Sequence, residues 1–279
     1  HMTTIREALR LGRVHLHQSP SPALDARLLL EHVLQRNHAY LIAHDDAPLN
    51  PDEEATYRTL LKRAAAGEPV PYLIGRAPFM GLDFKVSHHV LIPRPETEQL
   101  VEMAIAWGKG KGAIRVVDVG TGSGCIAISL AHYVPQAEII AVDVSPQALE
   151  IAAANVIRHA PGQVGLVRGD LLSPIAGGLD LIAANLPYIA GHEWPTLPIG
   201  VKSYEPTLAL HGGEDGLELI RELLPQAAER LRPGGLMLLE IGWQQGDPVA
   251  ALARKWFPAA DVMVRVDFAG HDRIVAVQL

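Results

Sequence analysis

The stretch Val116-Val117-Asp118-Val119-Gly120-Thr121-Gly122-Ser123-Gly124 runs from an apolar segment into a glycine-rich turn. The apolar segment predicts a strand buried on both faces, as in a parallel sheet. Glycines let the backbone turn sharply and approach a ligand without a Cβ clash. In open α/β sheets, nucleotide-like ligands bind where such a turn follows the carboxyl end of a strand. The stretch therefore predicts an α/β fold with a ligand at this loop.

Strands and helices alternate along the chain from residue 95 onward. This alternation predicts a parallel, doubly wound, Rossmann-like sheet of seven strands. The last two strands have no helix between them, so they should form an antiparallel pair. We predict strands at 114–119, 138–143, 164–168, 179–184, 235–241, 261–267 and 272–278, and helices at 96–107, 124–133, 146–159, 214–231 and 247–256.

The segment 3–75 predicts helices only. Thr4 is expected to cap the first helix, and a second helix begins near Pro22. Asn50 is expected to cap a third helix, with Glu53 completing a capping box. The sequence therefore predicts a helical N-terminal domain. It leaves open whether this domain is a structural cap or a docking surface for a partner.

Residues 76–94 are expected to form a β-hairpin linker between the helical domain and an α/β domain at 95–279. Apolar residues in this segment lie among Gly81 and Asp83, as in a short hairpin. Pro93 then holds the backbone extended before the next helix.

The composition limits the class of protein. A chain of 279 residues, 48% of them hydrophobic, is long enough for two domains. No apolar run reaches the ~18 residues that a membrane-spanning helix needs. Cys125 is the only cysteine, which excludes an internal disulfide or a multi-cysteine zinc site and fits the cytoplasm. We expect no metal, and we treat His1-Met2 as a cloning remnant.

The net charge of −7 weighs against a nucleic acid as the main partner. Proteins that bind a phosphate backbone usually present a basic face, because neutralising phosphates supplies much of the affinity. A local basic patch within an acidic total stays possible.

Two carboxylates follow the strands beside the glycine loop. Asp143 ends the second strand, where a carboxylate can accept hydrogen bonds from both hydroxyls of a ribose. Asp170 follows the third strand and is placed to reach an adenine amino group. The loop also satisfies a loose dinucleotide pattern through Gly122, Gly124 and Ala127, so this segment serves NAD and S-adenosylmethionine alike.

The fourth strand leads into Asn185-Leu186-Pro187-Tyr188. An amide nitrogen is a weak nucleophile because its lone pair is delocalised into the carbonyl. The side-chain oxygen of Asn185 and the backbone carbonyl of Leu186 can each accept one N–H of such a nitrogen and favour its electron-richer, pyramidal form. Pro187 keeps Leu186 extended, and Tyr188 offers a ring face to a planar amide or base. The run predicts methyl transfer to a planar amide or amine nitrogen, driven by alignment and electrostatics.

The chain resembles the HemK/PrmC family, the protein-(glutamine-N5) methyltransferases that modify peptide chain release factors. The Asn-x-Pro-Tyr motif is shared with DNA adenine methyltransferases and other nitrogen methyltransferases. The stretch from Arg94 to Glu98 and the helical module narrow the match. The resembling stretches are residues 71–75, 91–98, 120–124, 185–188, 204–206, 210–217 and 240–242.

The resemblance implies an S-adenosylmethionine-dependent methyltransferase, with S-adenosyl-L-homocysteine as the product. Its acceptor would be the glutamine in the Gly-Gly-Gln motif of class-1 release factors, and the helical domain would help to dock the factor. We expect a monomer that acts in the cytoplasm.

The resemblance also implies the residues of the site. Arg94 and Glu96 join the substrate-binding residues at the rim, with a structural salt bridge as the alternative. The implied catalytic and substrate-binding residues are Asn185, Leu186, Pro187 and Tyr188, and the implied cofactor-binding residues are Gly120, Thr121, Gly122, Ser123, Gly124, Asp143, Asp170, Leu171 and Asn185.

Two positions depart from the family pattern. Leu186 stands where the family usually has proline, which we expect to be tolerated with some loss of rigidity, because the acceptor there is a backbone carbonyl. Leu171 stands where some members carry an aromatic residue against the adenine.

Three alternatives remain beside this prediction. An adenine-N6 methyltransferase acting on nucleic acid shares the catalytic motif and predicts a basic groove. A nicotinamide oxidoreductase predicts NADH binding and gives no reason for the run at 185–188. A silent cofactor-binding scaffold would bind the cofactor and transfer nothing.

Overall fold

A computed structural model describes residues 3–279, so the remnant proposed at His1-Met2 lies outside the described residues. The chain divides into two compact units. The segment that ends at Arg76 forms the first unit together with Pro198–Tyr204, and Ala77–Leu197 with Glu205–Leu279 forms the second.

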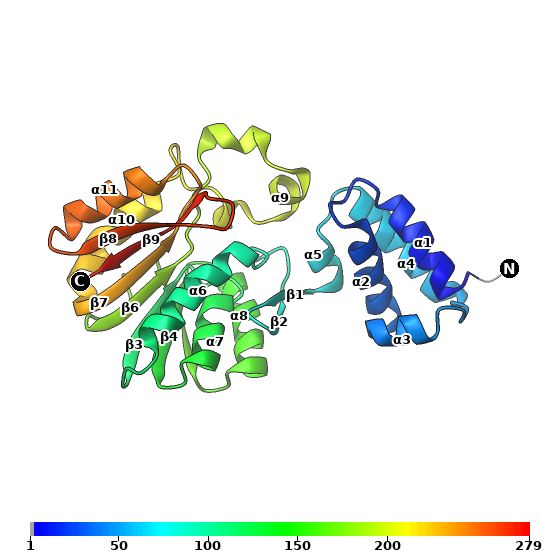
Figure 1. Cartoon of the computed structure of the whole chain (residues 1–279), viewed down its shortest axis with the longest axis horizontal. Coiled ribbons are helices and arrows are strands. Elements are labelled where there is room, and N and C mark those ends of the chain that lie inside the picture. Colours follow the sequence, from blue (N-terminus) through cyan, green and yellow to red (C-terminus); the bar gives the residue numbers. More distant parts are fainter. Residues whose placement is uncertain (1–2) are drawn as a thin grey trace. The chain divides into compact units, whose positions relative to one another are not determined.

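The second unit contains the predicted seven-stranded sheet, in the order β5-β4-β3-β6-β7-β9-β8 (Figure 1). The first five of these strands are parallel, and β8 and β9 form the predicted antiparallel pair. Strand β9 is also antiparallel to β7, which was not predicted. The strands are β3 Ile114–Val119, β4 Ala137–Asp143, β5 Val164–Arg168, β6 Leu179–Ala184, β7 Leu231–Glu240, β8 Asp261–Val266 and β9 Asp272–Gln278.

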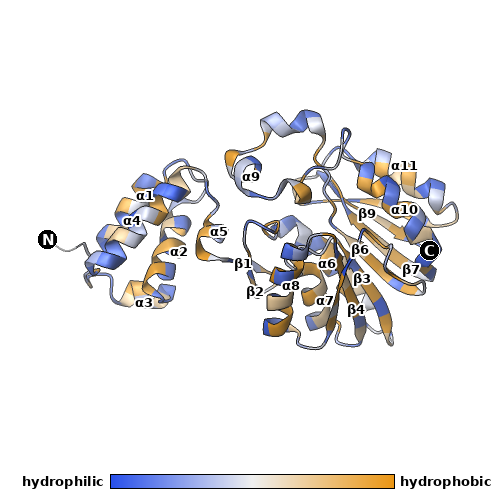
Figure 2. Cartoon of the chain, turned by 180° about the vertical axis from the view of Figure 1, so that it is seen from behind, coloured by the Kyte–Doolittle hydropathy of each residue, from blue (hydrophilic) through white to orange (hydrophobic). Residues whose placement is uncertain are grey.

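The apolar run of β3 is buried on both faces. Val117 and Val119 belong to the core on one face of the sheet, and Val116 belongs to the core on the other. Two groups of helices cover these faces, and the central strands are mostly hydrophobic (Figure 2). Helices α6 Pro95–Gly108, α7 Cys125–Tyr133 and α8 Pro146–His159 cover one face, and α10 Glu218–Arg230 and α11 Gly246–Trp256 cover the other.

Two predicted boundaries were wrong. The helix predicted from residue 214 begins at Glu218, because Gly213 and Gly216 take positive φ angles in a loop that packs on the backbone of Tyr188. The strand predicted from residue 235 begins at Leu231, which pairs with Leu179 before a register shift.

A short hairpin follows the first unit. Strands β1 Arg76–Phe79 and β2 Leu82–Lys85 form a two-stranded sheet, and Met80 and Gly81 have the positive φ angles of a tight hairpin turn. Phe79 and Phe84 are buried in the core of the second unit, which fixes the hairpin there.

The first unit is helical, as predicted, and has a core of its own. Both predicted caps are present as capping boxes, Thr4 with Glu7 and Asn50 with Glu53. The sequence patterns missed two short helices. The helices are α1 Ile5–His15, α2 Pro22–Leu34, α3 His38–Ala43, α4 Pro51–Ala65 and α5 Val70–Ile74.

The first unit also includes a helix that was not predicted. Helix α9 Ile199–Tyr204 lies between the 3₁₀ turns η1 Gly191–Thr196 and η2 Thr207–Ala209. It belongs to the first unit by packing, since a Cβ on Gly67 would lie 2.5 Å from the side chain of Ile199.

The helical core yields a stability prediction. Leu29 is fully buried on α2, whereas Leu24 on the same helix is 43% exposed. Leu29→Ala should lower the free energy of unfolding by about 2–5 kcal/mol, because it removes buried methyl groups and leaves a cavity. The matched control Leu24→Ala should change it by less than about 1 kcal/mol. Urea unfolding followed by circular dichroism measures both, and equal losses would contradict the packing described here.

Candidate functional site

A cavity of about 430 Å³ lies in the second unit at the carboxyl ends of β3 and β6. The strand order reverses between these two strands, which is where doubly wound sheets form ligand sites. The cavity is lined by residues 89–94, Thr97, residues 119–123, Cys125, Ile126, residues 142–145, Ala148, residues 169–171, residues 185–187, Pro206, Leu208, Ala209 and Leu219.

The structure brings together most of the predicted site residues. Gly120 to Ser123, Asp143, Asp170, Leu171, Asn185 to Pro187 and Arg94 all line the cavity. Gly124, Tyr188 and Glu96 are not among the lining residues. A Cβ on Gly124 would lie 3.4 Å from the Ala152 side chain, so this glycine lets α7 approach α8.

The glycine loop curves away from the sheet edge with positive φ angles. Gly120, Gly122 and Gly124 have φ values of 72°, 56° and 83°, which favour glycine. A Cβ on Gly122 would meet nothing within 4 Å, so the backbone there borders open space. A Cβ on Gly120 would lie 3.2 Å from the Leu186 side chain, so the loop and the Asn185 segment touch.

Asp118 holds the glycine loop in place through hydrogen bonds, a role that the sequence patterns did not predict. Its side chain is fully buried, and one oxygen accepts hydrogen bonds from the Thr121 hydroxyl at 2.6 Å and the Ala127 N–H at 3.2 Å. Burial raises the pKa of Asp118 to about 7. Its other oxygen, Oδ1, has no hydrogen-bond partner within residues 3–279. The signal in the sequence was an acidic residue inside a buried apolar strand.

Asp143 is held rigidly at the end of β4. Its two oxygens accept hydrogen bonds from the backbone N–H groups of Gly122 and Ser145, each at 2.9 Å. Each carboxylate oxygen keeps a further lone pair, so both can still accept a hydroxyl from the cavity. The loop and the carboxylate therefore form one preorganised wall.

Leu171 has an unusual backbone for its residue type. Its φ angle of 49° is left-handed, and its side chain is buried in the core while lining the cavity. This conformation turns the chain after Asp170 back toward the cavity wall.

The Asn185 segment is anchored by its neighbours. The Leu186 side chain is buried in the sheet core, and the Tyr188 carbonyl accepts a hydrogen bond of 3.0 Å from Gln245. Burial, and secondarily the charge of Glu240, raises the pKa of Tyr188 to about 12. Tyr188 is thus a neutral phenol near the buried Glu240.

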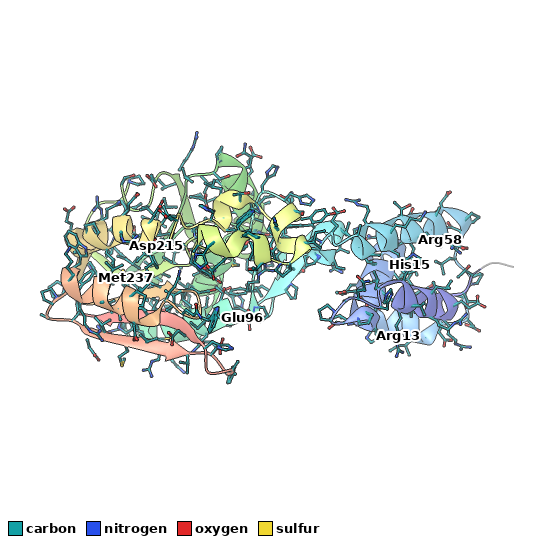
Figure 3. All side chains as sticks on the ribbon, turned by 90° about the horizontal axis from the view of Figure 1, so that it is seen from above. Arg13, His15, Arg58, Glu96, Asp215 and Met237 are labelled. Atoms are coloured by element: carbon teal, nitrogen blue, oxygen red, sulfur yellow. The ribbon has the colours of Figure 1, made fainter. Side chains whose placement is uncertain are left out.

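Arg94 forms a salt bridge, with Glu205 as its partner. The Glu205 side chain is 1% exposed, and its second oxygen accepts the Ile92 N–H at 3.1 Å. Glu96 lies in the first turn of α6 (Figure 3). The Arg94–Glu205 salt bridge joins the segment after the hairpin to the segment after α9. In the sequence, Glu205 appeared only within one of the stretches that resemble the family.

Thr97 lines the cavity, and Glu240 is buried at the end of β7; the sequence assigned neither of them a role. The Asn185 side-chain nitrogen donates to the Thr97 hydroxyl oxygen at 3.4 Å. Burial raises the pKa of Glu240 to about 7, and the nearby Thr97 hydroxyl and the charge of Arg273 oppose that rise.

Residues 3–279 contain neither a candidate metal site nor a candidate membrane-spanning helix. No cluster of three or more histidine, cysteine, aspartate or glutamate side chains is arranged to hold a metal ion. In the same range, every helix is too short or too polar to cross a membrane.

The fold and the place of the cavity, together with two family profiles, define a class, the Rossmann-like methyltransferases. The crystal structure of a methyltransferase from Pyrococcus furiosus shares the fold, with a TM-score of 0.54 and 19% identity over 80% of this chain and 97% of that chain. Two family profiles match the sequence, the PrmC N-terminal domain over residues 7–75 and the methyltransferase small domain over residues 106–197.

Two similar relatives narrow the class to a family. The release factor glutamine methyltransferase of Koribacter versatilis is 42% identical over 98% of this chain and 97% of its own length. That of Moorella thermoacetica is 43% identical over 97% and 96%. The chain belongs to the family of release factor glutamine methyltransferases, which confirms the resemblance found in the sequence.

The buried Asp118 yields a pH prediction. Because its folded pKa is raised from 3.8 to about 7, the folded state holds this proton more tightly than the unfolded state. Its contribution to stability therefore falls as pH rises from about 4 to about 7. Asp118→Asn keeps the size and an acceptor oxygen but cannot ionise, so its stability relative to wild type should improve between pH 5 and pH 8. Thermal unfolding across this range measures the difference, and parallel curves would contradict the prediction.

Proposed function

We propose that this chain transfers the methyl group of S-adenosylmethionine to the side-chain amide nitrogen (N5) of the glutamine in the Gly-Gly-Gln motif of class-1 release factors. One observation carries the proposal. Asn185 and Leu186 line the same cavity as the glycine loop, and the Leu186 side chain packs on Gly120. A methyl donor at the loop and an amide at Asn185 would thus be neighbours. The names of the full-length relatives support the release factor as substrate.

The cavity wall fits S-adenosylmethionine. The open space at Gly122 would let the methionine end of S-adenosylmethionine come close to the backbone of the glycine loop. The Asp143 carboxylate, which two backbone N–H groups hold in place, suits the ribose hydroxyls. Asp170 and Leu171 line the same cavity and are our candidates for the adenine. When bound, S-adenosylmethionine supplies an electrophilic methyl group on its sulfonium.

The chain's own residues would align the acceptor. The Asn185 side-chain oxygen and the Leu186 carbonyl each accept one N–H of the substrate amide, which fixes the nitrogen and stabilises the positive charge that develops on it. Holding two reactants in line can lower a barrier by on the order of 7–11 kcal/mol. Pro187 and Tyr188 shape the side of the pocket that receives the glutamine.

Leu186 replaces the usual proline without freeing the backbone. Its side chain is 5% exposed and lies in the sheet core. Burial of the Leu186 side chain immobilises the residue. Packing in the core, rather than a proline ring, therefore fixes the direction of the Leu186 carbonyl.

We further propose that residues 3–75 are the docking domain, that 76–94 are the linker to the catalytic domain at 95–279, and that the enzyme acts as a monomer. The first unit has its own core, and the PrmC N-terminal domain profile covers it. Because release factors work on ribosomes, we place the reaction in the cytoplasm.

A transfer assay tests the substrate. The protein is incubated with labelled S-adenosylmethionine and, in turn, a class-1 release factor, the same factor with the motif glutamine changed to alanine, and DNA. We expect label on the unmodified factor alone. Label on DNA would support the adenine-N6 alternative, and undiminished label on the altered factor would refute the glutamine assignment.

Asn185→Ala tests the acceptor role. Removing one aimed hydrogen-bonding group typically costs about 10²–10³ in kcat. We expect a loss of this size, while calorimetry shows the affinity for S-adenosylmethionine within a few fold of wild type. Turnover near the wild-type rate would remove the proposed role of Asn185.

Asp143→Ala tests the cofactor wall. The variant loses the acceptors for the ribose and for the Gly122 N–H, so the Kd for S-adenosylmethionine should rise about 10- to 100-fold. Calorimetry measures this without any release factor present. The matched control is Asp52→Ala in the helical unit, which should leave the Kd unchanged; an unchanged Kd in Asp143→Ala would contradict the assignment.

A further inference from the structure

Asn155 on α8 is a fully buried polar residue that the proposed chemistry does not use. Its side-chain amide makes three hydrogen bonds, all to backbone groups. The Asn155 oxygen accepts the Lys85 N–H at 2.7 Å, and the Asn155 nitrogen donates to the carbonyls of Lys85 at 3.0 Å and Ser123 at 2.8 Å. Lys85 ends β2, which lies beside α8 (Figure 1), and Ser123 belongs to the glycine loop. One buried side chain therefore joins the hairpin to the loop.

The three partners fix the orientation of the Asn155 amide. A backbone N–H only donates and a backbone carbonyl only accepts, so the amide oxygen and nitrogen cannot exchange places. The position needs one acceptor and two donors on a short side chain. An asparagine amide supplies this set, whereas an aspartate carboxylate of the same size would keep the acceptor and lose both donors.

Hydrogen bonds hold the glycine loop on both sides of the stretch that lines the cavity. The backbone at Gly122 borders open space, so packing does not fix it there. A peptide group is planar, so a hydrogen bond to its N–H or to its carbonyl fixes the direction of both. Asp143 fixes the peptide before Gly122 by accepting the Gly122 N–H at 2.9 Å, and Asn155 fixes the peptide after Ser123 by donating to the Ser123 carbonyl. Gly122 and Ser123, between these two peptides, line the cavity.

Asn155 also fixes the start of a second wall of the cavity. The chain leaves β2 at Lys85, and residues 89–94 line the same cavity as the glycine loop. The far end of this segment is held by Glu205, which accepts the Ile92 N–H at 3.1 Å. The two hydrogen bonds between Asn155 and Lys85 hold its near end. The same helix position therefore anchors both walls.

We propose that Asn155 is a positioning residue for the cofactor, which keeps the glycine loop and the wall at 89–94 at the separation that S-adenosylmethionine requires. The inference rests on the proposed function, because it takes S-adenosylmethionine as the ligand of this cavity. Asn155 is not among the lining residues and acts through the two backbone segments that it binds. Without these bonds, only a fraction of the molecules would hold the binding conformation, and the measured affinity falls by that fraction.

Calorimetry with S-adenosylmethionine tests the proposal without a release factor. Asn155→Ala removes all three hydrogen bonds, so the Kd should rise about 5- to 30-fold, the effect of one or two lost bonds. Asn155→Asp keeps only the acceptor and should also raise the Kd. A Kd within about 2-fold of wild type in both variants would overturn the proposal.

Val156→Ala separates positioning from a general loss of stability. Val156 is the next residue on α8, and its side chain is buried in the core on that face of the sheet. Its truncation should lower the melting temperature, as Asn155→Ala does, because both changes remove buried interactions. The Kd of Val156→Ala should nevertheless stay within about 2-fold of wild type, since this side chain does not bind the loop. An equal rise of the Kd in both variants would contradict the inference.

Kinetics with a release factor should divide the effect between KM and kcat. The KM for S-adenosylmethionine should rise with the Kd in Asn155→Ala. At saturating cofactor, kcat should stay within about 3-fold of wild type, because bound cofactor selects the correct loop conformation and Asn185 is unchanged. A loss confined to kcat would contradict a role in the cofactor walls.

Hydrogen exchange reads the loop in the absence of cofactor. The Gly122 amide donates to Asp143 rather than to Asn155, so its exchange reports on the opening of the loop as a whole. Its exchange should be about 5- to 30-fold faster in Asn155→Ala and close to wild type in Val156→Ala. Unchanged exchange in Asn155→Ala would overturn the proposal, whereas faster exchange in a protein that binds no S-adenosylmethionine would refute only the proposed function.

A last reading uses wild type alone and therefore holds even if the Asn155 variants do not fold. Saturating S-adenosylmethionine should slow the exchange of the Lys85 amide, because the cofactor stabilises the loop and Asn155 joins the loop to Lys85. Lys85 is itself not among the lining residues, so direct contact with the cofactor would not explain the effect. Exchange at Lys85 that ignores bound cofactor would contradict the inference.

Discussion

The side-by-side pairing of β3 and β6 is the constraint on which the rest of the site depends. Val119 at the end of β3 pairs with Ala184 at the end of β6, so the next residues, Gly120 and Asn185, leave the sheet at the same edge. The two strands are parallel and far apart in sequence. The order in which successive strands are added to the sheet reverses between them. A one-residue slip would send Asn185 to the opposite face and separate the acceptor group from the glycine loop.

Buried carboxylates hold the parts of the site in place. Asp118 supports the loop, and Glu205 holds Arg94 and the Ile92 backbone. Burying a carboxylate lowers the stability of the fold unless the group is paired. Buried carboxylates near one cavity therefore indicate that the fold accepts a loss of stability in order to fix the positions of the site residues. Asp118 and Glu240 each have one carboxylate oxygen without a hydrogen-bond partner within residues 3–279.

Rigidity at the reacting end comes from packing rather than from any single residue type. Leu186 immobilises its carbonyl by burying its side chain, and Gln245 fixes the Tyr188 carbonyl from the next loop. A second loop with glycines, residues 212–216, packs against the backbone of Tyr188. For this reason α10 begins later than its helical pattern predicts.

The sequence by itself determined the elements and the chemistry that they carry. Strand alternation, capping boxes, the glycine turn and the run at 185–188 are local patterns, since each depends on residues within a few positions of one another. The predicted site residues largely meet at one cavity because parallel strands deliver their carboxyl ends to one edge. Only the tertiary structure decided the contact of Thr97 with Asn185, the salt bridge of Glu205 and the placement of α9. Their partners lie far away in the chain, and no periodicity encodes which distant side chains a given packing brings into contact.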